Sequence, residues 1–317
     1  MIAELILSPH LFDSGNPNSE VLRTLAQVLF PLTSVSPAVI CEPGKNDWRT
    51  AVTRRIFSIR DANRRKEAMD LFMRIDREIL VRRPWQETSL GDSESVWVKA
   101  ARTLHEDVPL DAVVTDENYD DTLSLPVKQI NDPAFWQKYR NPRLVGRNLE
   151  SQNAALRTVC LHSDWLLVRM PYLKGSVDDE IVTVKQIIQL ASSLKTDPAG
   201  GLVTVQLDNR HANSDRFFRN VASELKNVRQ HSGRIKVELR DEKILNRELL
   251  GGEFAPRGEG KEPFHRARWF MQMTHVAIGG GGAHTDDNSW NLFDRRAASN
   301  RLEQIQRIEV VDSCEIT

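Results

Sequence analysis

The chain has few cysteines and no long hydrophobic run. Only three cysteines, Cys41, Cys160 and Cys314, occur among its 317 residues. Their odd number and wide spacing argue against a disulfide framework and against a cysteine-based zinc site. No apolar run approaches the roughly 18 to 20 residues that a membrane-spanning helix needs, and the start, Met1 to Leu7, lacks the basic region of a secretory signal. These absences predict a cytoplasmic protein without membrane association.

The chain also lacks an excess of either charge. It contains 43 Lys and Arg residues against 44 Asp and Glu residues, which gives a formal net charge of -1. No global positive field therefore attracts nucleic acid, and any such binding depends on local basic patches. Hydrophobic residues make up 40% of the chain, which is enough for a buried core. At this length we expect two domains.

The first half, residues 1–155, predicts a helix-rich α/β domain. Short apolar runs at Ala3–Leu7 and Ala38–Cys41 indicate strands, and apolar periodicity indicates a helix around Val21–Leu29. A long helical pattern follows from Trp48 to Val81. We therefore expect an α/β beginning that continues into one long helix.

Residues 84–155 carry prolines and glycines that interrupt every candidate element, so the sequence predicts loops and short elements there. An acidic cluster lies within this segment. It could bind a cation, but the absence of fixed spacing and of a neighbouring histidine favours a solvated turn. The cluster consists of Asp116, Glu117, Asp120 and Asp121.

The long helical pattern is rich in basic residues, mostly arginine. From Lys45 to Arg83 there are 12 basic residues against 6 acidic ones. One interpretation is a solvated helix with ion pairs between residues four apart. The other is a surface for phosphates or an acidic partner, because arginine suits bidentate phosphate contacts. The second interpretation would make the chain a structural adaptor that uses the Arg-rich face of residues 49–83.

The second half, residues 156–317, alternates strand and helix patterns and predicts a mixed sheet covered by helices. Strands are expected at 165–168, 202–207, 235–239, 268–273, 276–278 and 308–311, and helices at 179–194, 215–229 and near 290–302.

Three segments of this half resemble the phospholipase D-like fold, in particular its single-copy variants. Val168 to Leu173 resembles the first strand of such domains, which often ends in a Pro-Tyr pair, and Leu202 to Asn209 resembles the second. Pro263 to Gly282 resembles the motif region, where His-x-Lys or His-x-Arg begins a strand hairpin that ends in glycine. The resemblance covers about residues 157–317 and implies either a nuclease or a non-catalytic adaptor domain.

The motif departs from the catalytic pattern of that family. In catalytic members a histidine attacks phosphorus, a lysine holds the phosphate oxygens, and a second motif protonates the leaving group. If His265 takes the histidine position, Ala267 takes the cation position and Arg268 follows one residue late. If Arg268 is the cation, Arg266 replaces the histidine. Because only one motif occurs per chain, catalysis through His265 and Arg268 would also need a homodimer.

The four consecutive glycines of the motif region could line an anion site with their backbone N–H groups, or they could form only a mobile hairpin exit. From Arg210 to Arg268 there are 14 basic residues against 9 acidic ones, which favours nucleic acid as the anion. The expected phosphate- or nucleic-acid-binding residues are Arg266, Gly279, Gly280, Gly281, Gly282, Asn288, Ser289, Arg216 and Arg219.

The histidines near the motif invite a metal interpretation, but His265, His275 and His284 are nine and ten residues apart and match no compact zinc motif. We expect neither a metal nor a cofactor. The sequence favours nucleic-acid binding over nucleic-acid cleavage. It predicts a component of a multi-protein system that binds nucleic acid or a protein partner, and a role of that system in bacterial defence is implied by the resemblance alone. A metal-independent nuclease acting as a dimer through His265 and the adaptor described above are the alternatives, so whether the chain is an enzyme stays open.

Overall fold

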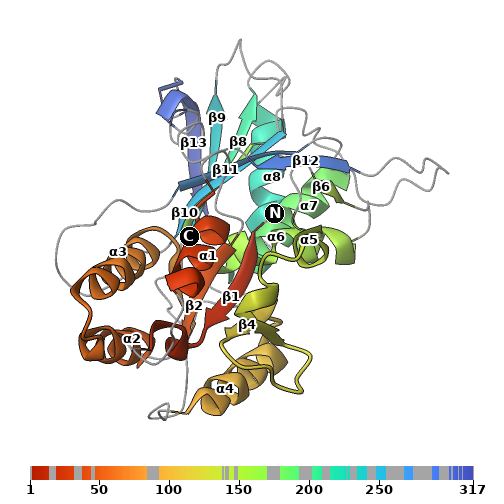
Figure 1. The fold of residues 1–317 in the computed structure, drawn as a ribbon. Coiled ribbons are helices and arrows are strands. Elements are labelled where there is room, and N and C mark those ends of the chain that lie inside the picture. Colours follow the sequence, from red (N-terminus) through yellow and green to blue (C-terminus); the bar gives the residue numbers. More distant parts are fainter. Residues whose placement is uncertain are drawn as a thin grey trace. The chain divides into compact units, whose positions relative to one another are not determined.

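The protein consists of two compact units, each built around its own sheet. In this computed structural model the described elements of residues 2–139 form one unit, and those from residue 140 onward form the other (Figure 1). The expected boundary between residues 155 and 156 falls inside helix α6 (Leu149–His162) of the second unit. The structure describes residues 2–13, 19–31, 38–43, 47–83, 93–137, 139, 143–145, 149–169, 179–192, 202–208, 215–226, 228, 234–240, 248–254, 268–273, 288–292, 300, 303–305, 307–308 and 310–316.

The first unit, called here the parallel-sheet unit, has the strand order β3-β2-β1-β4-β5, and all neighbouring strands are parallel. The residues of β1, β2 and β4 are all buried, as expected for a parallel sheet that is covered on both faces. The strands are β1 (Ala3–Leu7), β2 (Ala38–Pro43), β3 (Leu80–Arg83), β4 (Ala112–Thr115) and β5 (Ser124–Pro126). The helices are η1 (Pro9–Phe12), α1 (Ser19–Leu29), α2 (Asp47–Ser58), α3 (Ala62–Glu78), α4 (Glu94–Asp107), η2 (Val127–Gln129) and α5 (Pro133–Gln137).

Trp48 anchors helix α2 in the core of this unit. Its indole is fully buried and lies against the rings of Phe12 and Phe72. Its Nε1 donates a hydrogen bond of 2.7 Å to the carbonyl of Leu7, the last residue of β1. A buried indole N–H needs such a partner, so Trp48 fixes the start of α2 against the carboxyl end of β1.

Two expectations for the first half are wrong. The single long helix is two helices, because the Asp61 side chain accepts the backbone N–H of Arg64 at 2.8 Å and caps the start of α3. The segment expected to hold only loops and short elements contains α4, a helix of 14 residues. The interrupting prolines did not exclude it, since Pro84 and Pro109 both lie outside its bounds.

The second unit, called here the mixed-sheet unit, has the strand order β13-β9-β8-β7-β10-β11-β12-β6. Strands β7, β8 and β9 are parallel, and the remaining neighbours are antiparallel. The expected α/β class with a mixed sheet is confirmed. The strands are β6 (Arg143–Val145), β7 (Ser163–Arg169), β8 (Leu202–Asp208), β9 (Arg234–Arg240), β10 (Glu248–Phe254), β11 (Arg268–Met273), β12 (Asn288–Leu292) and β13 (Val310–Ile316).

The second half also differs from expectation in places. Strand β10 was not expected, and the helix expected near residues 290–302 does not begin at Trp290, which lies in β12. The strand expected at 276–278 lies outside the described residues. A strand that contains two adjacent glycines, Gly251 and Gly252, has little local tendency to be extended, so its place in the sheet is set by its neighbours.

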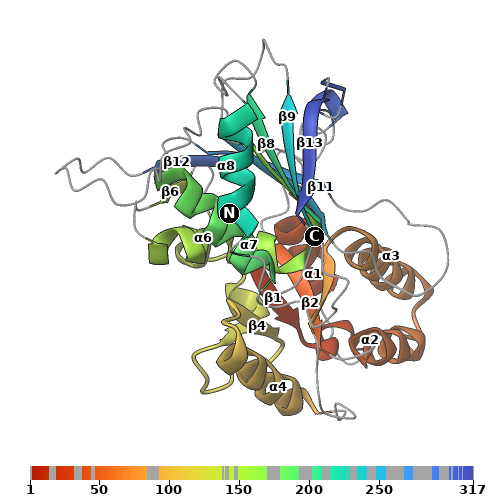
Figure 2. The same cartoon turned by 180° about the vertical axis from the view of Figure 1, so that it is seen from behind.

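Helices α6, α7 (Asp179–Ser192) and α8 (Asp215–Lys226) lie on the same side of the mixed sheet (Figures 1 and 2). Helix α6 contacts β7 and β10, and α8 contacts β9 and β13. Alternate residues of the parallel strands are apolar and buried, and they supply the face that a helical layer can cover. These residues are Leu166, Val168, Val203, Val205, Ile235, Val237 and Leu239. Among the described residues no helix is long and apolar enough to cross a membrane.

Candidate functional site

A row of buried polar residues crosses the mixed sheet at the carboxyl ends of its three parallel strands. The register pairs Arg169, the last residue of β7, with Gln206 of β8, and Gln206 with Glu238 of β9. Their exposed fractions are 1%, 2% and 5%. The backbone register extends the row through β10, β11 and β12 at Leu249, Gln272 and Asn291.

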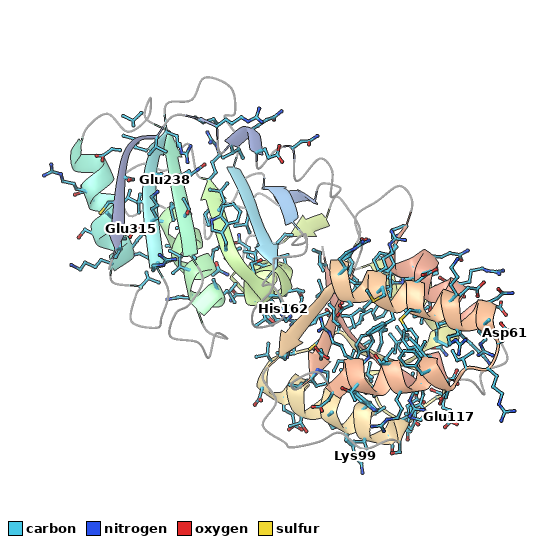
Figure 3. All side chains as sticks on the ribbon, turned by 90° about the vertical axis from the view of Figure 1, so that its left-hand side faces the viewer. Asp61, Lys99, Glu117, His162, Glu238 and Glu315 are labelled. Atoms are coloured by element: carbon cyan, nitrogen blue, oxygen red, sulfur yellow. The ribbon has the colours of Figure 1, made fainter. Side chains whose placement is uncertain are left out.

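Glu238, labelled in Figure 3, is the centre of a hydrogen-bonded network in this row. Its Oε2 accepts hydrogen bonds from Nε and Nη2 of Arg240, at 3.0 and 2.7 Å, and from Nε2 of Gln206 at 3.1 Å. Its Oε1 lies 2.9 Å from Nζ of Lys236. Burial alone would raise the pKa of Glu238, but the hydrogen bonds from Lys236, Arg240 and Gln206 outweigh burial and hold the pKa below its ordinary value. The carboxylate is therefore ionised at neutral pH.

Backbone contacts fix the Arg240 guanidinium. Its Nη1 donates to the carbonyl of Ile305 at 3.4 Å and to the carbonyl of Ile308, while Nε and Nη2 face Glu238. A guanidinium has five N–H donors and no acceptor, and here all three of its nitrogens are engaged. Contacts within the protein thus hold the cation at the carboxyl end of β9 in one orientation.

Positive charge exceeds negative charge in this network. Lys236 and Arg240 contact the buried carboxylate of Glu238, and Arg169 stands two strands away in the same row. The exposed Glu315 is opposite Lys236 in the register, so among the described side chains three cations stand against two carboxylates. Burying charge is costly, and buried charged groups are therefore normally paired with one another. This arrangement is able to attract an anion.

The network suits holding a phosphate better than moving a proton. The Glu238 carboxylate has a lowered pKa, and its oxygens already accept from Lys236, Arg240 and Gln206, so it is a weak general base at neutral pH. Arginine and lysine side chains, in contrast, are the groups that proteins use for phosphate oxygens. The carboxyl ends of parallel strands are also where open α/β sheets bind their ligands.

The structure separates the expected site residues along the sheet. Arg268 begins β11, and the register aligns it with Glu253 of β10, Trp165 of β7 and Leu202 of β8, at the amino ends of the parallel strands. Gln272, four residues later, stands in the polar row, so about 13 Å of strand lies between Arg268 and that row. Arg268 and the Glu238 network therefore lie at opposite ends of the parallel strands.

Asn288 and Ser289 lie toward the other end. Strand β12 is antiparallel to β11, with Asn291 opposite Gln272, so Ser289 lies beyond the polar row and away from Arg268. The register places Ser289 and Arg268 six residues apart along the strand direction, or about 20 Å. The backbone brings Asn288 and Ser289 toward the carboxyl-end row, but not toward Arg268.

The remaining expected residues fall elsewhere. Arg216 and Arg219 belong to α8, which contacts β9 and β13 from the helical layer, and the Arg219 side chain is exposed. His265, Arg266 and the glycines Gly279, Gly280, Gly281 and Gly282 lie outside the described residues. Their roles in phosphate binding or catalysis stay predictions.

The sequence interpretation missed Arg169, Gln206 and Glu238 as site residues. A signal was present, because each is a polar residue in a short apolar strand: Arg169 follows Leu-Leu-Val, and Gln206 and Glu238 stand between apolar neighbours. A polar residue at an alternate position normally indicates a solvated face. Only the register shows that these three positions coincide, and only their burial shows that the face is not solvated.

The acidic cluster of the parallel-sheet unit forms a hydrogen-bonded turn. The Glu94 carboxylate accepts the backbone N–H groups of Asp116 and Glu117, at 3.0 and 3.2 Å. Asp121 pairs with Arg102 at 2.6 Å. Within the described parts of the chain, no three His, Cys, Asp or Glu side chains are grouped as a metal site would require. Hydrogen bonds within the protein thus account for Glu94 and Asp121.

No model of a known protein family matches this sequence, and no curated protein matches it. Among solved structures, one similar chain is described as TrmBL2, an archaeal chromatin protein with a novel mode of DNA binding; the identity is 8%, the match covers 78% of this chain and 83% of that one, and the TM-score is 0.25. Another is glucose-6-phosphate dehydrogenase in complex with glucose-6-phosphate, at 9% identity, 96% and 82% coverage and a TM-score of 0.16. At such TM-scores neither similarity bears on fold or function.

Proposed function

We propose that this protein binds nucleic acid and that its mixed-sheet unit holds backbone phosphates at the carboxyl ends of β7, β8 and β9. The observation that carries the proposal is the cluster of cations at these strand ends, where Lys236 and Arg240 contact the buried Glu238 and Arg169 stands two strands away in the same row. In this proposal Glu238 is a positioning residue: it orients Lys236 and Arg240 and does not react. A polyanion rewards such cations because each neutralised phosphate releases counterions.

The phospholipase D-like resemblance supports the same class of ligand. Catalytic members of that family act on phosphodiesters, and the motif region of this chain, Pro263 to Gly282, keeps glycines while displacing its His and Arg. We therefore propose a degenerate, single-copy member that binds without turnover, within a multi-protein system that includes protein partners or a second copy. A place in bacterial defence follows by fold analogy alone.

Replacing Lys236 by glutamine is the sharpest test. Glu238 keeps its bonds from Arg240 and Gln206 in this variant, so the fold should persist. If Lys236 neutralises one phosphate, the slope of log affinity against log salt should fall by about 0.7 for a single strand or 0.9 for a duplex. Fluorescence anisotropy of labelled DNA and RNA oligonucleotides across a salt series measures both the affinity and the slope.

The matched control is Lys226→Gln. Lys226 is exposed at the last position of α8 and carries the same charge, but it lies outside the Glu238 network. This variant should keep the wild-type slope. The double variant Arg266→Gln, Arg268→Gln tests Arg268, at the other end of the sheet, together with its expected partner in the motif. If this variant loses binding while Lys236→Gln binds normally, the assignment to the carboxyl ends is wrong.

The same oligonucleotides should remain intact in EDTA, because the proposed site binds without turnover. Gel electrophoresis after incubation with the full chain checks this outcome. Cleavage that persists in EDTA and is lost in His265→Ala would instead favour the metal-independent nuclease that acts as a dimer.

A further inference from the structure

The junction of α2 and α3 carries the densest positive charge of the parallel-sheet unit. Between residues 54 and 66 the chain holds six basic residues and one acidic residue. This segment, called here the basic corner, spans the end of α2, the linker at residues 59–61 and the start of α3. Its basic residues are Arg54, Arg55, Arg60, Arg64, Arg65 and Lys66, and its acidic residue is Asp61.

Two of these arginines hold the corner in place. Arg55 donates through Nη1 to both carboxylate oxygens of Asp13, at 2.9 and 2.8 Å, and its Nη2 lies 2.8 Å from Nε2 of His10. Because a guanidinium only donates, His10 accepts at Nε2 and carries its proton on Nδ1, which lies 3.2 Å from Asp13. Arg64 donates to the carbonyl of Asp13 at 3.1 Å. The corner is therefore anchored to the segment that follows β1.

The other four basic side chains, Arg54, Arg60, Arg65 and Lys66, are exposed. Phe57 lies among them in sequence and is 65% exposed, the largest exposed fraction among the large apolar residues described. In helix α2 it stands three positions after Arg54, so the two side chains share one face. An exposed aromatic ring is thus surrounded in sequence by guanidinium and ammonium groups.

Acidic residues balance part of this charge, because Asp13 pairs with Arg55 and Asp61 lies within the corner itself. The carboxylate of Asp61 accepts the backbone N–H of Arg64 as the cap of α3. Two described ion pairs of α3 lie toward its other end, where Arg74 pairs with Glu78 and Arg49 of α2 pairs with Asp76. The positive charge of α2 and α3 is therefore concentrated at the corner rather than spread over both helices.

We propose that the basic corner is a binding surface for single-stranded nucleic acid, in which an unpaired base stacks on Phe57 while adjacent phosphates contact Arg54, Arg60, Arg65 and Lys66. The combination of an exposed ring with a basic surface is how single strands are bound without sequence preference, since every base has a face that stacks. An acidic protein segment would use the charges but gain little from the ring. This surface belongs to the parallel-sheet unit and does not depend on the Glu238 network.

Neutralising the exposed charges tests the electrostatic part. The triple variant Arg60→Gln, Arg65→Gln, Lys66→Gln of the full chain should bind a labelled oligo-dT or oligo-U strand at least about tenfold more weakly, with the salt slope lowered by about 2. The matched control is Arg77→Gln, Lys99→Gln, Lys128→Gln, which removes three exposed charges of the same unit outside the corner. Equal affinity of the triple variant and this control would overturn the proposal.

Phe57→Ala tests the stacking part and distinguishes nucleic acid from an acidic protein. Loss of one stacked base should weaken binding about tenfold without changing the salt slope. Phe57→Trp should retain the wild-type affinity because it keeps a ring. Since Phe57 is exposed, neither change should disturb the core. Wild-type affinity in Phe57→Ala, together with competition by poly-glutamate at equal charge concentration, would overturn the proposal in favour of an acidic partner.

Asp61→Asn should increase affinity, and a variant that merely unfolds would not show an increase. Asparagine caps a helix about as well as aspartate, so α3 keeps its start, while the corner loses its one negative charge. We expect affinity for the single strand to rise about two- to threefold at low salt. An unchanged or lower affinity in a variant with wild-type thermal stability would count against the corner.

Cross-linking locates the strand independently of affinity. An oligonucleotide that carries 5-iodouracil should cross-link, on irradiation of the full chain, to the peptide that contains Phe57, as mass spectrometry would detect. Cross-links confined to the mixed-sheet unit would overturn this proposal while supporting the Glu238 site. Cross-links confined to the Phe57 peptide would support the corner and count against that site, so the two proposals fail separately.

Discussion

Arg83→Met should lower the free energy of unfolding of the parallel-sheet unit by about 3 to 5 kcal/mol. The guanidinium of Arg83 bonds both oxygens of Glu4 at 2.6 Å through Nε and Nη2. The two side chains are 5% and 0% exposed. Burial disfavours the charged form of Arg83, but the hydrogen bonds and attraction of Glu4 raise its pKa above the ordinary value. Methionine would leave the Glu4 carboxylate buried without its counter-charge.

Arg83→Met should also remove hydrogen bonds to backbone carbonyl groups. Arg83 donates to the carbonyls of Leu104 and Val108, at 3.2 and 2.6 Å, near the end of α4. Amide hydrogen exchange of peptides from β1 and β2, followed by mass spectrometry, measures the opening of this unit directly. Exchange should accelerate in Arg83→Met across both strands, because the ion pair joins β3 to β1.

Two variants separate the ion pair from a general effect of substitution. Glu4→Leu combined with Arg83→Met should recover part of the loss, because replacing both partners of a buried pair leaves no unpaired charge. Arg102→Met removes an arginine whose pair with Asp121 is exposed on the arginine side, and it should cost less than about 1 kcal/mol. If the peptides of β1 and β2 are protected from hydrogen exchange equally in Arg83→Met and Arg102→Met, the buried ion pair does not stabilise this sheet.

Local sequence patterns predict the helices and strands whose conformation follows from their own residues. The alternation in residues 235–239 gives β9, and the apolar stripes of α7 and α8 give those helices, because periods of two and 3.6 residues follow directly from backbone geometry. Strand β10 and helix α4 escaped the same reasoning. The first contains two glycines and depends on β7 and β11 for its hydrogen bonds, and the second is flanked by prolines that resemble interruptions.

The candidate site was less predictable because its residues meet through register. Arg169, Gln206 and Glu238 come from three strands separated by helices, and no pattern within one strand states which residue of the next will stand beside it. The motif region shows the converse. Arg268 and Ser289 are 21 residues apart in sequence, yet the register of their antiparallel strands places them toward opposite ends of the sheet. Their positions in the sequence therefore predicted a shared site that the backbone does not form.

Glu238→Gln should lower the free energy of unfolding of the mixed-sheet unit by about 3 kcal/mol at pH 7. Glutamine keeps the volume of the side chain, so no cavity forms. It removes the negative charge that compensates Arg240, which is buried, and Lys236, which is half-buried. The matched control is Glu315→Gln, since Glu315 is opposite the same Lys236 in the register but is an exposed carboxylate on the edge strand β13 (Figure 3). This control should stay within about 0.5 kcal/mol of the wild type.

The effect of Glu238→Gln should disappear in acid. A group whose pKa is lowered by folding contributes stability that is fully present above its ordinary pKa and is lost as the pH falls through its folded value. The ordinary value for Glu238 is 4.5, and folding lowers it. The difference in stability between wild type and Glu238→Gln should therefore be constant from pH 7 to about pH 5 and shrink below pH 4.5. Urea unfolding at each pH measures the difference, and a gap that persists undiminished at pH 3 would show that charge compensation is not what Glu238 contributes.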